Sequence, residues 1–189
     1  FYTIEHAETL AIFANQAALA LEKARLFEEV QFLAITDSLT GFFNRRHFFN
    51  LAEKEFERSL RYHRPLALLM LDLDEFKQVN DRYGHLVGDQ ILQTTTAIIR
   101  ENLRKVDIPG RYGGEEFVVL MPETYREHAV QAAERLRQTI AGFPIILLDE
   151  TITITTSIGV ACCDNQDDLR LEMLLNRADE ALYQAKHMG

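Results

Sequence analysis

The first part of the chain has a hydrophobic pattern that predicts one long helix. Residues 5 to about 35 contain neither Gly nor Pro. Their apolar residues recur every seven positions in two neighbouring series, Phe13, Ala20, Phe27 and Ala34 beside Ile12, Leu19, Leu26 and Leu33. This repeat is typical of a helix with a wide apolar stripe, which must be buried. The stripe either packs onto its own domain or forms a parallel helix pair that joins two protomers.

The rest of the chain alternates between strand and helix patterns. The cluster TDSLTG, residues 36–41, interrupts the long helix. After it we expect a helix over 44–63 that ends before Pro65, a strand over 66–74, helices over 75–84 and 88–104, a hairpin around Gly113 and Gly114, a helix over 126–142, a strand over 152–162 and a helix over 174–187. The order βαββαβ, with added helices, predicts an α+β fold with a central, mainly antiparallel sheet backed by helices, similar to the ferredoxin-like split βαβ plan. We expect two parts, a helix over 1–35 and a domain over 36–189.

The composition restricts the possible partners. The net charge of −9 argues against a broad surface that neutralises nucleic-acid phosphates, so a small anionic substrate would need local lysines or a metal ion. The adjacent Cys162 and Cys163 fit neither a disulfide framework nor a zinc site, which favours a reducing compartment. No apolar run has the length of a membrane span and the start has no signal-peptide layout. We therefore expect a cytoplasmic fragment of a longer protein, without membrane contact in this part.

The strand over 66–74 carries the first chemical signal. Alternation places one set of its residues on each face, Leu68, Met70, Asp72 and Asp74 on one and Leu69, Leu71 and Leu73 on the other. A buried carboxylate needs a cation, backbone N–H groups or a nearby Arg or Lys. Capping of the next helix would explain Asp74 well and Asp72 less well.

The stretch RYGGEEF, residues 111–117, sets two glycines against two glutamates. One interpretation is an ordinary hairpin, in which Gly113 and Gly114 supply the positive φ angles of a two-residue loop and the glutamates face water. The other places the hairpin beside the strand over 66–74, so that Asp72 and Glu115 meet as hard oxygen ligands suited to Mg²⁺. Glycines would also let a polyanion approach the backbone closely.

The segment from Lys77 to Asp89 offers groups that suit a nucleotide. An ordinary helix–turn–helix surface is the simplest explanation of Lys77, Asn80, His85 and Asp89. However, an Asp can accept both edge N–H groups of guanine, and an Asn offers one donor and one acceptor. Helical turns after Asp74 would present free amides to phosphates, with Lys77 adding a positive charge.

Five collinear motifs resemble the GGDEF domain of diguanylate cyclases over about residues 36–189. They are DSLTGFFNRR, LDLDEFKQVNDRYGHLVGD, RYGGEEF, TTSIGVA and ADEALYQAK, and GGEEF is an accepted variant of the signature. The resemblance implies a fold similar to nucleotide cyclases and polymerase palms. It also implies condensation of two GTP into cyclic di-GMP with release of two pyrophosphates.

The resemblance also implies roles for single residues. Asp72, the backbone carbonyl of Leu73 and Glu115 match the ligands of Mg²⁺, or of Mn²⁺ in its place. Glu115 matches the residue that helps to deprotonate the attacking 3′-hydroxyl, and Glu116 lies beside it. The substrate-binding positions are Asn80, His85 and Asp89 on the guanine side, Lys77 and Lys186 at the phosphates, and Phe76. The family usually continues with an Arg just past Gly189.

The sequence also suggests how the activity is regulated. One domain holds one GTP, so two domains must face each other, and we expect a homodimer. The stretch ANQAALALEKARLFEEVQFLA looks like the last helix of a GAF-type sensor that continues into the cyclase as a signalling helix. Arg104 and Asp107 alone are typical of a solvated ion pair. By resemblance, however, they form with Arg135 an inhibitory site for the product.

Two other classes of function stay open at this point. The domain could be a receptor for GTP or cyclic di-GMP without turnover, although the intact Asp72, Glu115, Asn80 and Asp89 count against it. It could also be a purely dimerising signalling module, which would leave the buried acids unexplained.

Overall fold

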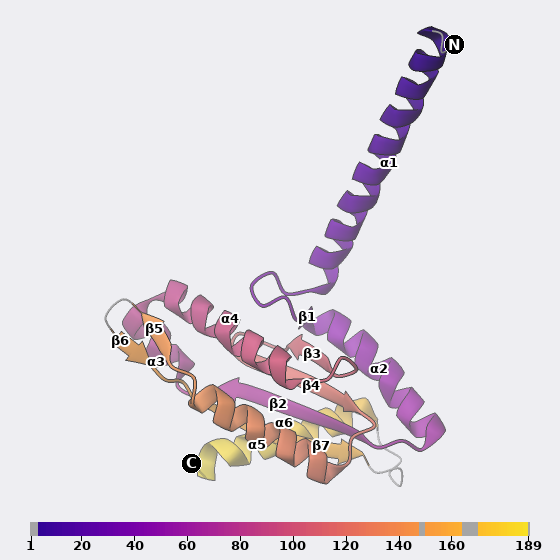
Figure 1. Cartoon of the computed structure of the whole chain (residues 1–189). Helices are drawn as coiled ribbons and strands as arrows, with labels where there is room; N and C mark the ends of the chain where they lie inside the picture. Colours follow the sequence, from indigo (N-terminus) through magenta and orange to yellow (C-terminus); the bar gives the residue numbers. More distant parts are fainter. Residues whose placement is uncertain (1–3, 148–149, 164–169, 189) are drawn as a thin grey trace. The chain divides into compact units, whose positions relative to one another are not determined.

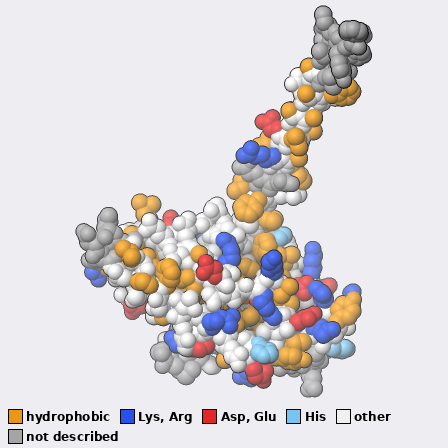
Figure 2. Space-filling model, viewed as in Figure 1, with side chains coloured by type: hydrophobic (Ala, Val, Ile, Leu, Met, Phe, Trp, Pro, Cys, Tyr) orange, Lys and Arg blue, Asp and Glu red, His pale blue; other side chains and the backbone are white. Residues whose placement is uncertain are grey.

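The computed structural model describes residues 4–147, 150–163 and 170–188 of the chain. It divides into two compact units, Phe1–Thr36 and Asp37–Gly189. The described part of the first unit is the helix α1 (Ile4–Ile35), drawn in indigo in Figure 1. Several large apolar side chains along α1 are more than half exposed: Phe13, Leu19, Leu26, Phe27 and Leu33. Figure 2 shows hydrophobic side chains along this helix.

The second unit is built on a five-stranded sheet with the strand order β1-β3-β4-β2-β7. The strands are β1 (Phe43–Asn44), β2 (Leu66–Leu73), β3 (Ile108–Arg111), β4 (Glu116–Pro122) and β7 (Thr156–Cys163). Strand β2 runs antiparallel to both β4 and β7, and β3 runs antiparallel to β4. Only the pairing of β1 with β3 is parallel among the described strands. The predicted βαββαβ order and mainly antiparallel sheet are confirmed.

Helices cover both faces of this sheet, as Figure 1 shows. They are α2 (Arg45–Tyr62), α3 (Phe76–Tyr83), α4 (His85–Asn102), α5 (Arg126–Ala141) and α6 (Leu171–Met188). One core cluster joins Leu69 and Leu71 of β2 to α4 and α5, and a second joins Leu68 and Met70 to α2 and α6. The alternation predicted for this strand is therefore confirmed, and it gives β2 an apolar layer on each side.

The predicted strand over 152–162 is wrong at its start. Residues Glu150–Ile152 form β6, which pairs with β5 (Ile145–Leu147) in a separate two-stranded sheet. The main-sheet strand β7 begins only at Thr156. Its predecessor Thr155 is held by Asp74, whose backbone N–H donates to the Thr155 carbonyl at 3.0 Å. This contact continues the antiparallel pairing of β2 with β7 by one residue, while residues 153–155 belong to neither strand, so one apolar run becomes two strands. Helix α4 also starts earlier than expected, at His85 rather than at Gly88.

Candidate active site

The ends of β2 and β4 bring three predicted acids to one place. In the antiparallel register Asp72 lies opposite Glu116, and the Leu73 N–H donates to the Glu115 carbonyl at 3.4 Å. The predicted adjacency of this strand and the hairpin is therefore confirmed. It follows that the ends of two buried strands carry carboxylates at the same edge of the sheet.

Asp72 is buried and paired. Its Oδ1 lies 2.7 Å from Nζ of Lys186, which α6 supplies. The Thr156 hydroxyl donates to the Asp72 backbone carbonyl at 2.9 Å and so fixes the strand end. The sequence assigned Lys186 to phosphate binding, whereas the structure places its ammonium group on Asp72.

Glu116 experiences an excess of negative charge. Burial raises the pKa of Glu116, and the charges of Asp72 and Glu115 raise it further. Asp179 on α6 acts in the same direction, whereas Lys186 opposes it. Sequence reasoning missed Asp179, although it lies in the motif ADEALYQAK. The cluster therefore has more carboxylates than one lysine can neutralise.

This donor set suits a hard divalent cation. Carboxylate oxygens of Asp72 and Glu115 and the carbonyl of Leu73 are the ligand types that Mg²⁺ prefers, and a cation would relieve the repulsion that raises the pKa of Glu116. Across residues 4–147, 150–163 and 170–188, no group of three His, Cys, Asp or Glu side chains is already arranged around a metal position. Instead, Lys186 holds one oxygen of Asp72.

The turn between β3 and β4 differs from the predicted two-residue loop. It contains four residues, 112–115, and the described glycines with positive φ are Gly41 and Gly84. The positive φ predicted for Gly113 and Gly114 is therefore wrong, because a longer loop does not need it. A Cβ atom at Gly113 would overlap the Glu116 carboxylate. Gly113 thus provides room for that side chain.

Asp74 binds hydroxyl groups rather than capping a helix. Its carboxylate accepts hydrogen bonds from Thr155 and Ser157, each at 2.7 Å. The cap position of α3 is Glu75, with a φ of 56° and no capping hydrogen bond from its side chain, so the capping role predicted for Asp74 is wrong. An open cavity of about 580 Å³ lies here, lined by residues that include Asp72, Asp74, Glu75, Ser157 and Lys186.

The predicted guanine-side residues lie on α3 and α4. Asn80 packs directly against Gly88, since a Cβ atom there would overlap the Asn80 side-chain oxygen and crowd the Phe76 ring. Phe76 is buried, Asn80 is partly buried, and Lys77, His85 and Asp89 are exposed. The predicted residues therefore form separate groups: the acids with Lys186 at the strand ends, Asn80 with Phe76 beside Gly88, and the three exposed side chains.

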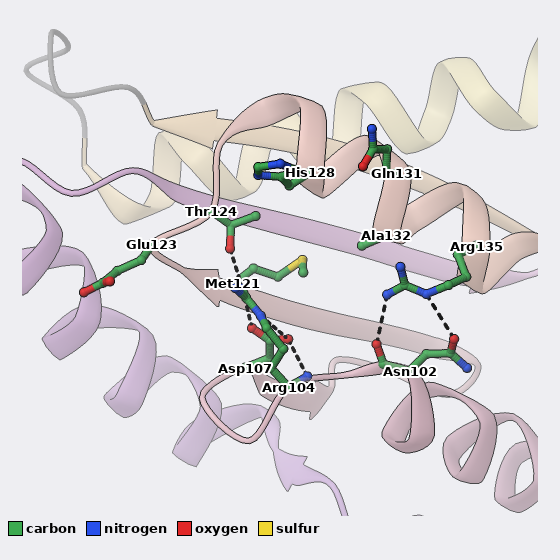
Figure 3. Close-up of a pocket in the computed structure, with 10 residues that line it drawn as sticks. All are labelled: Asn102, Arg104, Asp107, Met121, Glu123, Thr124, His128, Gln131, Ala132 and Arg135. Atoms are coloured by element: carbon green, nitrogen blue, oxygen red, sulfur yellow. Dashed lines mark hydrogen bonds and ion pairs between the residues drawn. The ribbon is translucent and has the colours of Figure 1, made fainter.

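A second pocket lies around Arg104 and Asp107 (Figure 3). The Arg104 guanidinium contacts Asp107 Oδ1 at 2.9 Å and the Thr124 hydroxyl at 2.5 Å, and its backbone N–H donates to Asp107 Oδ2 at 2.8 Å. The Asp107 side chain is only 1% exposed. The interpretation as a solvated ion pair is therefore wrong, because one partner is inside the protein.

Arg135 lines the same pocket from α5. It donates to the Asn102 side-chain and backbone oxygens at 3.2 and 3.1 Å. The cavity holds about 220 Å³, and its other lining residues are Met121, Glu123, Thr124, His128, Gln131 and Ala132. Sequence reasoning missed His128 and Gln131. Their spacing from Arg135, seven and four positions along α5, could have placed them on one helix face.

No helix in the described ranges combines the length and the apolar character needed to cross a bilayer.

Known proteins resemble this chain over most of its length. It is 42% identical over 159 residues to the response regulator PleD of Caulobacter vibrioides, covering 83% of this chain and 35% of PleD. It is 35% identical over 189 residues to the diguanylate cyclase DgcM of Escherichia coli, covering 97% of this chain and 45% of DgcM. The chain thus spans less than half the length of these relatives.

Among solved structures, the coiled coil and GGDEF domain of DgcB from Caulobacter crescentus, in complex with c-di-GMP, matches with a TM-score of 0.85. The identity is 26%, over 96% of this chain and 95% of that one. The profile of the family "Diguanylate cyclase, GGDEF domain" matches residues 34–189. The chain therefore belongs to the GGDEF domain family of diguanylate cyclases.

Proposed function

We propose that this chain condenses two GTP molecules into cyclic di-GMP and releases two pyrophosphates. The observation that carries the proposal is the group of carboxylates from β2 and β4 beside a cavity that Lys186 lines. Burial, together with the charges of Asp72 and Glu115, raises the pKa of Glu116 in this group. A chain with this group needs added positive charge, and the divalent metal ion that accompanies GTP supplies it. The name diguanylate cyclase that DgcM carries supports the same activity.

The protein groups mainly bind and orient the triphosphate. Mg²⁺ or Mn²⁺, held by Asp72, the Leu73 carbonyl and Glu115, would stabilise the attacking oxygen and the phosphate charge. The first amides of α3 and the Lys77 side chain face the triphosphate, since no side chain caps this helix end. Lys186 can exchange its contact with Asp72 for a phosphate oxygen.

The adjacent glutamates, Glu115 and Glu116, remove the proton from the 3′-hydroxyl. Glu115 accepts this proton in our proposal. The raised pKa of Glu116 makes its carboxylate a stronger base than an ordinary glutamate, so it stabilises the transferred proton nearby. The close fit of Glu116 against Gly113 keeps this carboxylate at the turn.

Guanine recognition uses α3 and α4. Asp89 accepts two N–H groups from the base edge and Asn80 supplies one donor and one acceptor, while Phe76 and His85 complete the site. Gly88, the residue before Asp89, has no side chain and therefore lets Asn80 lie against α4. An ATP molecule would offer Asp89 no matching donor pair.

Turnover requires two copies of the domain in this proposal, because one nucleotide cannot attack itself. The exposed apolar residues of α1 support a parallel helix pair between protomers, which an upstream GAF-like sensor would control. The coiled coil named in the matching DgcB structure supports this role.

The Arg104 pocket is the proposed inhibitory site for cyclic di-GMP. Arg104 and Arg135 present guanidinium groups to the phosphates, and the buried Asp107 keeps Arg104 in place. The c-di-GMP complex formed by DgcB supports product binding by this family.

The deciding experiment measures pyrophosphate and cyclic di-GMP with purified protein, GTP and Mg²⁺. We expect both products in a ratio of two to one, with ATP as a poor substrate and an Asp72→Asn variant as the inactive control. Binding of cyclic di-GMP without turnover would instead support a receptor. The absence of any thermal stabilisation by either nucleotide would support a dimerising module.

A further inference from the structure

Arg111 makes an unusual set of contacts with the turn that carries Glu115. Its Nε donates to the carbonyls of Gly113 and Gly114 at 3.2 and 3.1 Å, and its Nη2 donates to Gly114 at 2.6 Å. Its Nη1 contacts both carboxylate oxygens of Asp37 at 3.0 and 3.1 Å. One guanidinium therefore binds two consecutive turn carbonyls and one distant carboxylate.

Asp37 is itself fixed. Its Oδ1 accepts hydrogen bonds from the Thr40 N–H at 2.9 Å and the Thr40 hydroxyl at 2.7 Å. Its backbone N–H donates to Phe42 and its carbonyl accepts from Gly41, both at 2.8 Å. Burial alone would raise the pKa of Asp37, but the bonds from Thr40 and the charge of Arg111 outweigh it and lower the pKa. Asp37 is thus an ionised, immobilised anchor.

The turn needs such support because of its sequence. Gly113 and Gly114 have no side chains that could restrict their backbone, and ordering glycine costs more entropy than ordering any other residue. The guanidinium supplies donors in a rigid planar fork, which a lysine cannot reproduce. With both glycine carbonyls bound, the peptide that leads into Glu115 has a fixed direction.

We propose that Arg111, anchored by Asp37, is a positioning residue that sets the geometry of Glu115 and Glu116. This inference rests on the proposed cyclase activity. The anchor is the first residue of the second unit, two positions after the end of α1. The catalytic turn is therefore tied to the segment directly after α1.

The test compares Arg111→Lys, Arg111→Ala and Asp37→Asn with the wild type. Asp37→Asn keeps an oxygen that can accept from Thr40 but removes the charge that holds Arg111. Arg137→Gln is the matched control, because it breaks an ion pair with Glu134 on the surface of α5, away from the turn. The measurements are kcat and KM for GTP with Mg²⁺, amide hydrogen exchange at Tyr112 and Gly113, and cyclic di-GMP binding at the Arg104 pocket.

We expect kcat to fall by about tenfold in Arg111→Lys and further in Arg111→Ala, with a smaller change in KM, because misplacement by about 1 Å can cost up to about a hundredfold. The amides of Tyr112 and Gly113, which donate to the Glu116 carbonyl, should exchange faster. Cyclic di-GMP binding and the Arg137→Gln control should match the wild type.

Three results would overturn the proposal. They are a wild-type kcat in Arg111→Lys, unchanged exchange at the turn in Arg111→Ala, and a loss of product binding in step with kcat, which would indicate general unfolding. If the wild type itself lacks turnover, the cyclase function fails, and hydrogen exchange still decides whether Arg111 holds the turn.

Discussion

The strand-end acids and the Arg104 pocket both gather charged residues, but they balance those charges differently. Around Asp72 and Glu116 the carboxylates outnumber their only described cationic partner, Lys186, and the pKa of Glu116 rises. In the Arg104 pocket the buried carboxylate of Asp107 receives both the guanidinium and the backbone N–H of Arg104. Arg135 is similarly occupied by Asn102.

The group of acids at the strand ends therefore lacks a positive charge, whereas the charged groups of the Arg104 pocket already have partners. Unrelieved repulsion costs folding free energy, so the acids are explained best by a cation that arrives with substrate. The paired arginines are preorganised, and their remaining donors can bind an anion without much rearrangement. The four predictions below test whether the two regions are independent, from the largest effect to the smallest.

Removing a single charge from the acidic group should have the largest effect. We expect Glu115→Gln to lower cyclic di-GMP synthesis at least about a hundredfold, because transition-state charge stabilisation at one group has this magnitude. Product chromatography after incubation with GTP and Mg²⁺ measures it. Glu127→Gln, the same change in the first turn of α5, is the control. Near-normal synthesis by Glu115→Gln would remove this residue from the mechanism.

The base-recognition groups should affect selectivity rather than chemistry. Asp89→Ser removes a carboxylate that accepts two N–H groups, so GTP should lose about ten- to a hundredfold in kcat/KM relative to ATP. Competition between the two nucleotides in one assay gives the ratio. Asp81→Ser, an equivalent change on α3, should keep it. An unchanged ratio in Asp89→Ser would place guanine recognition elsewhere.

Much of the fold and of the candidate site could be predicted from the sequence. The features that the sequence did not predict depend on tertiary contacts. Alternation along Leu66–Leu73 identified both faces of β2 and the position of Asp72, because period and burial are local properties. The pairing of Lys186 with Asp72 joins residues from distant parts of the chain, which no spacing rule reports.

The errors in loop regions have a similar origin. The loop at Gly113 and Gly114 was misjudged because loop length depends on where β3 and β4 stop pairing. Asp74 was expected to cap a helix, but its carboxylate is bound by Ser157 on β7 and by Thr155 just before that strand. Local sequence rules therefore predicted the helices and strands. The partners of the polar side chains could be identified only from the folded structure.

Substitutions in the Arg104 pocket should change product inhibition without changing initial rates. Arg104→Ala should raise the inhibitory concentration of cyclic di-GMP, but it also leaves the buried Asp107 without its guanidinium, which destabilises the fold. Arg135→Ala avoids this problem, and we expect it to raise the inhibitory concentration about tenfold. Arg137→Ala on the same helix is the control. Inhibition that only raises the KM for GTP, with equal potency in the wild type and both pocket variants, would contradict a separate site.

The smallest predicted effect concerns stability. The pKa of Glu116 is raised in the folded protein above its ordinary value of 4.5, so its ionised form destabilises the fold at neutral pH, and this cost disappears as pH falls through the raised pKa. Glu116→Gln should therefore raise the Tm at pH 7 in the absence of Mg²⁺ and GTP. Because the side chain is partly exposed, solvent screening limits the rise to about 1–4 °C. Thermal unfolding across pH 4–8 should show the two proteins converging in acid. A Tm of Glu116→Gln at or below the wild-type value at pH 7 would mean that the acidic group carries no unrelieved repulsion, and the contrast with the Arg104 pocket would be lost.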